Sequence, residues 1–325
     1  MKLKQSIASL AACLFLAGSA LAQQAFPAKP ITLIVPFPAG GPSDALARAV
    51  AQGMAADLKQ TVVVENIGGA SGTIGLMKLV NAAPDGYTMS FGTIGTHVAN
   101  AALFKKLPYD PHTSFAPVGL AGTAPLLLVV KASLPVSNLK EFVAYAEANK
   151  ASMTYGSAGV GSISHYACVV LLSALKQNIT HVPYRGVAPA MNDLMGGHID
   201  FMCDQSTTAL PQIAGGKIKA LAVLSDQPLP QLPGVATAAS AGYDVNLRSW
   251  NALFVPKATP PAVVARLNEA LRAAVADPAL VKQMEAVGVD LPSSAALQPA
   301  TVTDLIARGL EKDVPALRAR GEYLD

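Results

Sequence analysis

Short continuous apolar runs alternate along the chain with stretches whose apolar residues recur at three- and four-residue spacing. The runs predict buried strands, and the spaced stretches predict helices. The predicted strands are residues 31–36, 61–65, 88–92, 126–130, 153–156, 180–183, 199–203, 220–224 and 252–255, and the predicted helices are 43–58, 73–82, 138–149, 163–175, 187–195, 261–276 and 278–287. Continuous apolar strands separated by helices are typical of parallel sheets covered on both faces. The pattern predicts an α/β fold with two doubly wound lobes.

The order of these elements divides the chain into two lobes. We expect residues 27–124 and 250–325 to form the first lobe and residues 125–249 the second. The last two predicted helices have no sheet of their own, so they would return to cover the first lobe. The chain would then cross between the lobes near residues 122–126 and 246–252. Proline-rich or polar linkers of any length are missing from the sequence, which predicts closely coupled lobes.

The first 22 residues have the features of an export signal. Two lysines open the chain, an apolar stretch covers residues 7–16, and small residues at 20–22 form a cleavage site. The apolar stretch is shorter than the roughly 20 residues that span a bilayer. We therefore expect export with cleavage after Ala22, and the alternative is a lipoprotein signal that ends at Cys13.

Charge and composition narrow the class of protein. Loss of residues 1–22 removes two lysines and no acidic residue, so the formal net charge falls from +3 to +1. So small a net charge does not indicate binding to nucleic acid or to an acidic membrane surface. The charged fraction of 14% and the apolar fraction of 51% are those of a compact globular chain.

Two cysteines remain after the predicted cleavage, Cys168 and Cys203. An oxidising compartment would permit a disulfide between them. Both lie in apolar runs, so packing as small free hydrophobic residues is the alternative. Cysteine and histidine pairs with the spacing of a metal site are missing from the sequence, and we expect neither a metal nor a cofactor.

Two glycine turns connect a strand directly to a helix. The strand 31–36 runs into Gly40 and Gly41 before the helix 43–58, and a second Gly/Ser turn precedes the helix 163–175. The first amides of a helix have no intrahelical partner, so a helix start preceded by a glycine turn can bind an anion. One such unit in each half suggests a ligand held between two lobes.

Several motifs in this order resemble one protein family. They are KPITLIVPFPAGGPSD, VENIGGASGTIG, PDGYTM, YGSAGVGSISH, HVPYRGVAPAMNDLMGGHIDFMCD and GKIKALAVLS. From about Pro30 to about Leu317 the chain resembles the Bug family of extracytoplasmic solute-binding proteins, which serve tripartite tricarboxylate transporters. The resemblance implies a Venus-flytrap fold of the periplasmic binding protein type II kind, with a small carboxylate in the central cleft. It also implies a periplasmic, monomeric receptor with a membrane permease as partner.

The resemblance also implies the binding residues. In such proteins one carboxylate is held by two turns, largely through backbone N–H groups and bridging waters. The first turn corresponds to Phe37, Pro38, Ala39, Gly40 and Gly41, the second to Ser157, Ala158, Gly159, Val160, Gly161 and Ser162, and the remaining wall to Thr93, Thr96, His97, Asp204 and Gln205. Cys203 and Gln205 depart from the Asn, Ser or Phe that the family often has there, so the resemblance does not fix which carboxylate is bound.

Some of these side chains also have a structural interpretation. Ser162 is placed either to cap its own helix or to donate to a ligand, and Asp44 fits a cap better because its charge repels an anion. Arg185 would pair with a second carboxylate, remain solvated or bridge the lobes. His97 follows a strand end, where cleft residues emerge in open α/β sheets, and local backbone bonding is the alternative.

An enzyme is the competing class. The nucleophile-elbow pattern Gly-x-Ser-x-Gly fails because Tyr155 occupies its first position. A dinucleotide fingerprint that begins at Gly159 fails because Ser164 replaces its third glycine. The sequence therefore indicates a non-catalytic binding protein, and a sensor that signals to another protein is the remaining alternative to a transport receptor.

Overall fold

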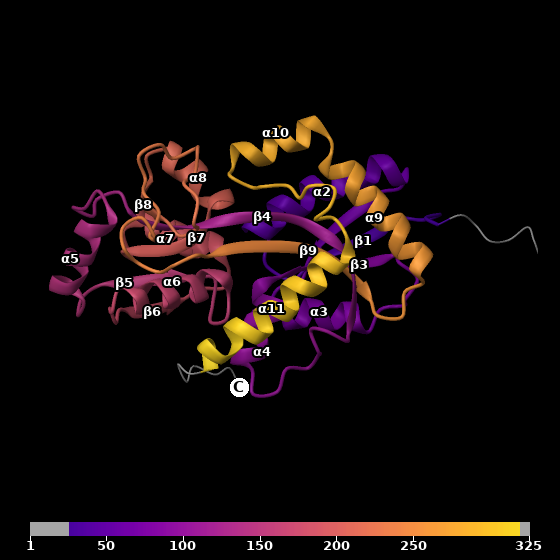
Figure 1. Ribbon diagram of the computed structural model, residues 1–325, viewed down its shortest axis with the longest axis horizontal. Helices are drawn as coiled ribbons and strands as arrows, with labels where there is room; N and C mark the ends of the chain where they lie inside the picture. Colours follow the sequence, from indigo (N-terminus) through magenta and orange to yellow (C-terminus); the bar gives the residue numbers. More distant parts are fainter. Residues whose placement is uncertain (1–25, 319–325) are drawn as a thin grey trace, which may run out of the picture.

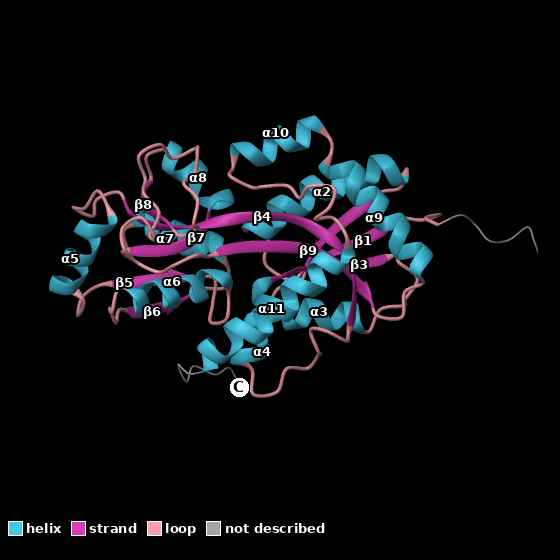
Figure 2. Ribbon diagram, viewed as in Figure 1, coloured by secondary structure: helices cyan, strands magenta, loops and turns pink. Residues whose placement is uncertain are grey.

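The computed structural model describes residues 26–318, and the predicted export signal lies outside them. Within this range a single nine-stranded sheet has the order β2-β1-β3-β9-β4-β7-β5-β6, and β8 pairs with β4. Helices lie on both faces of this sheet (Figures 1 and 2). The chain therefore has the mixed α/β fold that the sequence predicts.

The elements have these bounds. The strands are β1 (Ile31–Val35), β2 (Val62–Asn66), β3 (Thr88–Thr93), β4 (Phe115–Lys131), β5 (Thr154–Ser157), β6 (Thr180–Pro183), β7 (Phe201–Gln205), β8 (Ile218–Val223) and β9 (Arg248–Pro256). The helices are α2 (Pro42–Leu58), α3 (Thr73–Val80), α4 (Asn100–Leu103), α5 (Leu139–Asn149), α6 (Ile163–Ala174), α7 (Val187–Gly196), α8 (Ser206–Ala214), α9 (Pro261–Val275), α10 (Pro278–Ala286) and α11 (Pro299–Arg318). A 3-10 turn covers Ala70–Gly72 and a π-helical turn covers Gly95–Ala99.

The sheet is parallel on each side and antiparallel in its middle. β1 pairs in parallel with β2 and β3, and β5 pairs in parallel with β6 and β7, as the apolar runs predict. β9 is antiparallel to both β3 and β4, and β4 is antiparallel to β7 and β8. The apolar runs do not predict these antiparallel pairs, which arise because β4 and β9 carry the chain across the molecule in opposite directions.

β4 and β9 are the long strands at the centre of the sheet (Figure 2). Residues 115–125 of β4 pair with β9, and the rest of β4 pairs with β7 and β8. We call the part built on β1 to β3 the first half and the part built on β5 to β7 the second half. The two strands thus connect the halves where the sequence predicts crossings. The division of the chain into two lobes at residues 124 and 250 remains a prediction.

The helices that follow β9 cover the first half of the sheet. α9 packs on α2 and β4, and α10 packs on α2 and α9. The contact between α9 and α2 is close, because a Cβ added at Gly53 would lie 2.7 Å from Ala274 Cβ. On the other face, α11 runs beside α4 (Figure 1). The apolar residues of the two halves form the buried core on both faces of the sheet.

Four parts of the described fold are missing from the predicted set: the N-terminal part of β4, the short helix α4, α8 and α11. The N-terminal part of β4 contains Gly119 and Gly122, which interrupt the apolar run. The helix α8 begins with polar residues and contains Pro211. α11 has Val302, Ile306, Val314 and Leu317 buried along one side, so its helical spacing is present in the sequence.

Cys168 and Cys203 form a disulfide that joins α6 to β7. Both residues are fully buried. The bridge settles the alternative that the sequence leaves open, and free packing of the two thiols is excluded in this structure.

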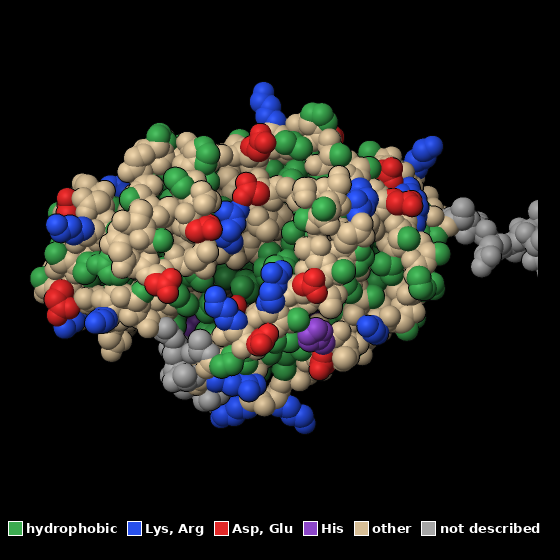
Figure 3. Space-filling model, in the orientation of Figure 1, with side chains coloured by type: hydrophobic (Ala, Val, Ile, Leu, Met, Phe, Trp, Pro, Cys, Tyr) green, Lys and Arg blue, Asp and Glu red, His purple; other side chains and the backbone are tan. Residues whose placement is uncertain are grey.

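The surface and interior of the described residues show three further features. Acidic and basic side chains are interspersed over the face in Figure 3, without a field of one sign. Among residues 26–318, no helix has the length and apolar character needed to cross a membrane. His, Cys, Asp and Glu side chains in that range also form no group of three or more that would hold a metal ion.

Candidate functional site

Two neighbouring cavities lie between the glycine turn after β1 and the Gly/Ser turn after β5. The outer cavity has a volume of about 680 Å³, and the inner cavity, which we call the inner chamber, has a volume of about 50 Å³. The two cavities share Phe37, Pro38, Ala158, Ser162 and Gly186. Both therefore lie between the first and second halves of the molecule.

The outer cavity is walled mainly by backbone and small side chains. Its lining residues are Pro36, Phe37, Pro38, Gly68, Gly69, Ala70, Ser71, Gly72, Ala158, Gly159, Val160, Ser162, Tyr184, Arg185 and Gly186. Arg185 is the one cation in this lining and its side chain is exposed. The cavity thus combines an apolar, adaptable wall with a single positive charge.

The inner chamber lies where four helices begin. Gly41, Ser162, Gly186 and Gln205 are the N-cap residues of α2, α6, α7 and α8, and all four line the chamber. The rest of the lining is Phe37, Pro38, Pro42, Ser43, Thr93, Ala158, Ile163, Ser164 and Val187. Each helix start presents unpaired amides and a partial positive charge. The chamber therefore has the electrostatics of an anion site.

Most of the turn amides that the sequence assigns to the carboxylate are already bonded within the protein. Gly40 N donates to Asp44 Oδ2 at 3.0 Å, and Gly159 N donates to Ser157 Oγ at 3.1 Å. Gly161 N donates to His165 Nδ1 at 3.3 Å. These bonds shape the two turns and are not directed at a ligand.

The amide of Ala158 is also bonded within the protein, because it donates to Ser164 Oγ at 2.9 Å. The amides without an intrahelical partner lie one or two residues further on, inside the first turn of each helix. In α2 they start at Ser43, because Pro42 has no N–H. In α6 they start at Ile163 and in α7 at Val187. The available donors are therefore the first amides of the helices, which the sequence also predicts, and not the bonded amides of the turns.

Asp44 fixes the first turn. Its carboxylate accepts from Gly40 N, from Arg48 Nε at 3.1 Å and from Asn66 Nδ2 at 2.9 Å. Burial alone would raise the pKa of Asp44, but the hydrogen bonds from Arg48, Gly40 and Asn66 outweigh it and hold the pKa below its usual value. Asp44 lines neither cavity, which agrees with its structural interpretation.

Ser162 fixes the second turn. Its hydroxyl accepts from His165 N at 3.2 Å as the N-cap of α6, and it donates to Gly159 O at 2.6 Å. At the start of the same turn, Ser157 Oγ lies 2.7 Å from His181 Nε2. Ser162 lines both cavities. Its hydroxyl hydrogen is bonded to Gly159 O and is not directed at a ligand.

His97 and Thr96 lie in the core instead of the cleft. Neither residue has exposed surface, and neither lines a cavity described above. The ring of His97 stacks on Phe254 at 4.1 Å, and its Nδ1 lies 2.9 Å from Thr96 Oγ1. Burial lowers the pKa of His97 to about 3. The π-helical turn after β3 directs this side chain inward, which sequence spacing cannot reveal.

The remaining predicted residues also fall into two groups, those that line a cavity and those that do not. Thr93 and Gln205 line the inner chamber, whereas Ala39 and Asp204 line neither cavity. Asp204 is buried and accepts from Thr208 Oγ1 at 2.5 Å, and burial raises its pKa to about 6. Sequence reasoning missed Ser43, Ile163, Gly186 and the glycine-rich segment 68–72, although each lies in or beside a quoted motif.

Two contacts join the halves at the mouth of the site. Ser71 Oγ donates to Val160 O at 2.7 Å, and a Cβ added at Gly186 would lie 3.2 Å from Pro38 Cγ. These contacts bring the two halves close together beside the two cavities.

Comparison with known proteins agrees with this architecture. Residues 46–321 match the family described as tripartite tricarboxylate transporter family receptor. A UPF0065 protein from the TAR-I region of Agrobacterium vitis is 39% identical over 297 residues, which cover 90% of this chain and 86% of that protein.

Two solved structures have the same fold. The periplasmic binding protein BugD superposes with a TM-score of 0.88 at 36% identity, over 92% of this chain and 99% of BugD. MatC from Rhodopseudomonas palustris, solved with bound malate, superposes with a TM-score of 0.85 at 36% identity, over 89% of this chain and 99% of MatC. The comparisons thus confirm the Bug-type resemblance and place the chain among solute-binding proteins, not enzymes.

Proposed function

The chain belongs to the tripartite tricarboxylate transporter receptor family, and we propose that it is an exported receptor that closes over a small carboxylate and delivers it to a membrane permease. In this proposal residues 1–22 direct export and are cleaved after Ala22. Residues 27–124 with 250–325, and residues 125–249, act as the two lobes. The receptor works as a monomer whose partners are the solute and the permease of a tripartite transporter.

The convergence of four helix starts on the inner chamber is the observation that supports this proposal. Each start favours an anion by about 0.3–1 kcal/mol, and each hydrogen bond to a charged group contributes about 1.5–3 kcal/mol. Micromolar affinity requires about −8.2 kcal/mol. Four or five such bonds would suffice after ordering costs, although no Lys or Arg lines the inner chamber.

The sizes of the two cavities indicate how a solute would lie. The inner chamber, at about 50 Å³, suits one carboxylate group, and the outer cavity, at about 680 Å³, would hold the body of the molecule. Phe37 and Pro38 line both cavities and would contact that body. Arg185 in the outer cavity would pair with a second carboxylate. MatC, which is 36% identical, binds malate, so a small dicarboxylate is the proposed ligand class.

The predicted residues that line neither cavity would support the site from behind. In this proposal Gly40, Ser157 and Gly161 hold the two turns in shape, and Asp204 and Thr96 support the walls. Closure requires ligand contacts from both lobes, because a ligand shifts a two-state equilibrium only by its differential affinity. Ser43 on α2 and Ile163 on α6 would supply those contacts through their amides.

A carboxylate panel tests the proposal. The mature protein would be mixed with malate, succinate, citrate and benzoate, with the corresponding neutral methyl esters as controls. We expect at least one acid to raise the melting temperature and to bind in calorimetry with a micromolar or lower Kd, because a ligand at 100 times its Kd stabilises the folded state by about 2.7 kcal/mol. Equal binding of acids and esters, or no binding of any acid, would contradict the proposal.

A further inference from the structure

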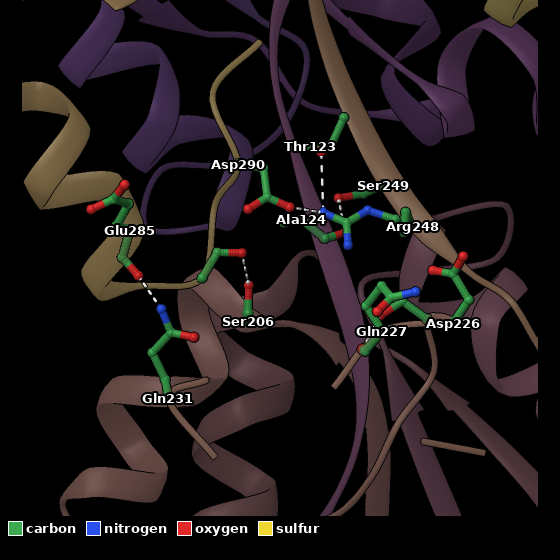
Figure 4. A network of polar contacts seen from close by, with 12 residues as sticks. Thr123, Ala124, Ser206, Asp226, Gln227, Gln231, Arg248, Ser249, Glu285 and Asp290 are labelled. Carbon is green, nitrogen blue, oxygen red and sulfur yellow. Dashed lines mark hydrogen bonds and ion pairs between the residues drawn. The ribbon is translucent and has the colours of Figure 1, made fainter. Parts of the chain in front are cut away.

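The strand β9, at the centre of the sheet, bonds to two residues that line the inner chamber, Gln205 and Ser43. Ser249, its second residue, pairs with Ala124 of β4 where the two strands connect the halves. Its neighbour Arg248 donates to Thr123 Oγ1 at 3.2 Å and forms an ion pair with Asp290 (Figure 4). Ser249 therefore lies in a part of β9 that is held in place from several sides.

Ser249 bonds directly to a residue of the chamber wall. Its Oγ donates to Gln205 Oε1 at 2.5 Å, and both residues are buried, with exposed fractions of 2% and 4%. The same hydroxyl lies 3.1 Å from Ala124 O. A hydroxyl has a single hydrogen to donate, and the shorter contact is the one with Gln205. The acceptor oxygen of the Gln205 amide is thus engaged by β9.

The other end of this amide is open to the chamber. A glutamine side chain has one acceptor oxygen and an NH₂ group with two donors. Among residues 26–318, Gln205 Nε2 has no hydrogen-bond acceptor within the protein, and it is not one of the fully enclosed polar atoms that lack a partner. Because Gln205 lines the inner chamber, its NH₂ group faces the space that a ligand would fill.

A second residue on the same face of β9 contacts the opposite wall. Asn251 lies two residues after Ser249, and alternate residues of a strand share one face. Asn251 Oδ1 accepts from Ser43 Oγ at 2.9 Å. Ser43 comes from α2 in the first half, whereas Gln205 comes from the end of β7 in the second. One face of β9 thus holds chamber residues from both halves.

We propose that Ser249 is a positioning residue that turns the Gln205 amide so that its NH₂ group donates into the inner chamber, which selects ligand groups that offer only acceptors, such as a carboxylate. This inference rests on the proposed function, because it takes the inner chamber as the carboxylate site. Without the Ser249 hydroxyl, the amide loses its fixed partner and presents oxygen or nitrogen to the ligand alternately.

A double-mutant cycle with malate as the probe tests this coupling. Calorimetry should show that Ser249→Ala weakens malate binding about fivefold, and that Gln205→Met weakens it about tenfold. In the Gln205→Met background, Ser249→Ala should cause no further loss, because the group it positions is gone. Ser249→Thr, which keeps the hydroxyl, should restore affinity. Equal effects of Ser249→Ala in both backgrounds, or no effect in either, would overturn the inference.

Ser90→Ala is the matched control. Ser90 is also fully buried in the sheet, and its hydroxyl donates to Ile34 O at 3.1 Å, away from both cavities. Its removal should lower the melting temperature as Ser249→Ala does while the Kd for malate stays unchanged. A loss of malate affinity in Ser90→Ala equal to that in Ser249→Ala would overturn the inference, because the effect would then be general destabilisation.

A ligand-free measurement separates this inference from the proposed function. Nitrogen-15 relaxation of the Gln205 side-chain amide should report a rigid NH₂ group in the wild type and in Ser90→Ala, and a mobile one in Ser249→Ala. Unchanged rigidity in Ser249→Ala would overturn the inference whether or not malate binds. A mobile amide in that variant, together with a wild type that binds no carboxylate, would support the positioning and reject the proposed function alone.

Discussion

Pro38 and Gly186 face each other across the mouth of the inner chamber, one from each half of the molecule. A Cβ added at Gly186 would lie 3.2 Å from Pro38 Cγ and 3.4 Å from Pro38 Cβ. At these distances an alanine Cβ would lie closer to the Pro38 ring than most side-chain contacts allow, so the ring or the backbone would shift by a few tenths of an ångström. We therefore expect this pair to influence closure of the site.

Gly186→Ala should weaken carboxylate binding by about tenfold or more, because overpacking a closed contact costs about 1–3 kcal/mol. Calorimetry with malate would measure the change in Kd. The fold should remain intact, with a loss of about 1–3 kcal/mol in unfolding free energy, because φ 116° with ψ 170° is a conformation that essentially only glycine adopts.

Gly197→Ala is the control for Gly186→Ala. Gly197 follows the other end of α7, has φ of +80°, and has no atom within 4 Å of an added Cβ. It should lose about 1–2 kcal/mol of stability, because alanine is disfavoured in the left-handed region, and it should keep its malate affinity. Equal Kd values for the two variants would reject the closing role of Pro38 and Gly186.

Ser162→Ala should reduce the free energy of unfolding by about 1 kcal/mol, because it removes the N-cap of α6. The Kd for malate should change by less than about threefold, since the hydroxyl hydrogen is bonded to Gly159 O. Urea unfolding and calorimetry measure the two effects. Asn138→Ala, which removes the N-cap of α5, should show the same loss of stability. A variant of normal stability that binds malate tenfold more weakly would instead make Ser162 a ligand donor.

Stability should fall as the pH falls from about 6.5 toward 4. Burial lowers the pKa of His97 to about 3 and that of His165 to about 4, whereas an unfolded histidine titrates near 6.5. Between these values the unfolded chain binds more protons, so each histidine contributes stability above pH 6.5 that is lost on acidification, at up to about 1.4 kcal/mol per pH unit. Urea unfolding at several pH values measures this slope.

His97→Leu should reduce that slope, because one of the two buried imidazoles is removed. Buried Asp204, whose pKa is raised to about 6, opposes the slope between pH 4 and 6. We therefore compare the change of unfolding free energy between pH 6.5 and 6, where titration of the histidines contributes most of the pH dependence. An identical slope in wild type and His97→Leu would show that this ring does not titrate as a buried neutral group.

Removal of the Cys168–Cys203 disulfide should cost about 2–4 kcal/mol of unfolding free energy, because the bridge closes a loop with a sequence separation of 35 residues. Cys168→Ser with Cys203→Ser would be compared with the wild type in urea, with and without a reductant. The reductant should destabilise the wild type and leave the double variant unchanged. Insensitivity of the wild type to reduction would indicate that the bridge does not form.

The sequence predicts the outer parts of the fold well, since their periodicity is local. Strands β1 to β3 and β5 to β7 are continuous apolar runs, so their parallel pairing follows from the pattern. The central strands were harder to predict, because Gly119 and Gly122 interrupt the first half of β4. Its antiparallel pairing with β9 joins residues more than 120 positions apart in the sequence, which no local pattern contains.

Most of the residues predicted for the two turns line one of the two cavities, and their contact with a ligand stays a prediction. The glycine turns at Gly41 and Ser162 identified the correct helix starts, because only small residues permit such a strand-to-helix connection. The amides of Gly40, Gly159 and Gly161 are bonded to the side chains of Asp44, Ser157 and His165, and the sequence alone does not give the orientation of those side chains. His97 was placed in the cleft for the same reason.

A crystal structure of the protein with malate is the measurement that tests the central claim most directly. The account predicts one carboxylate of malate in the inner chamber, with oxygens within hydrogen-bond distance of the Ser43 amide from α2 and of the Ile163 or Ser164 amide from α6. Malate bound only to one half, or confined to the outer cavity beside residues 68–72, would contradict it.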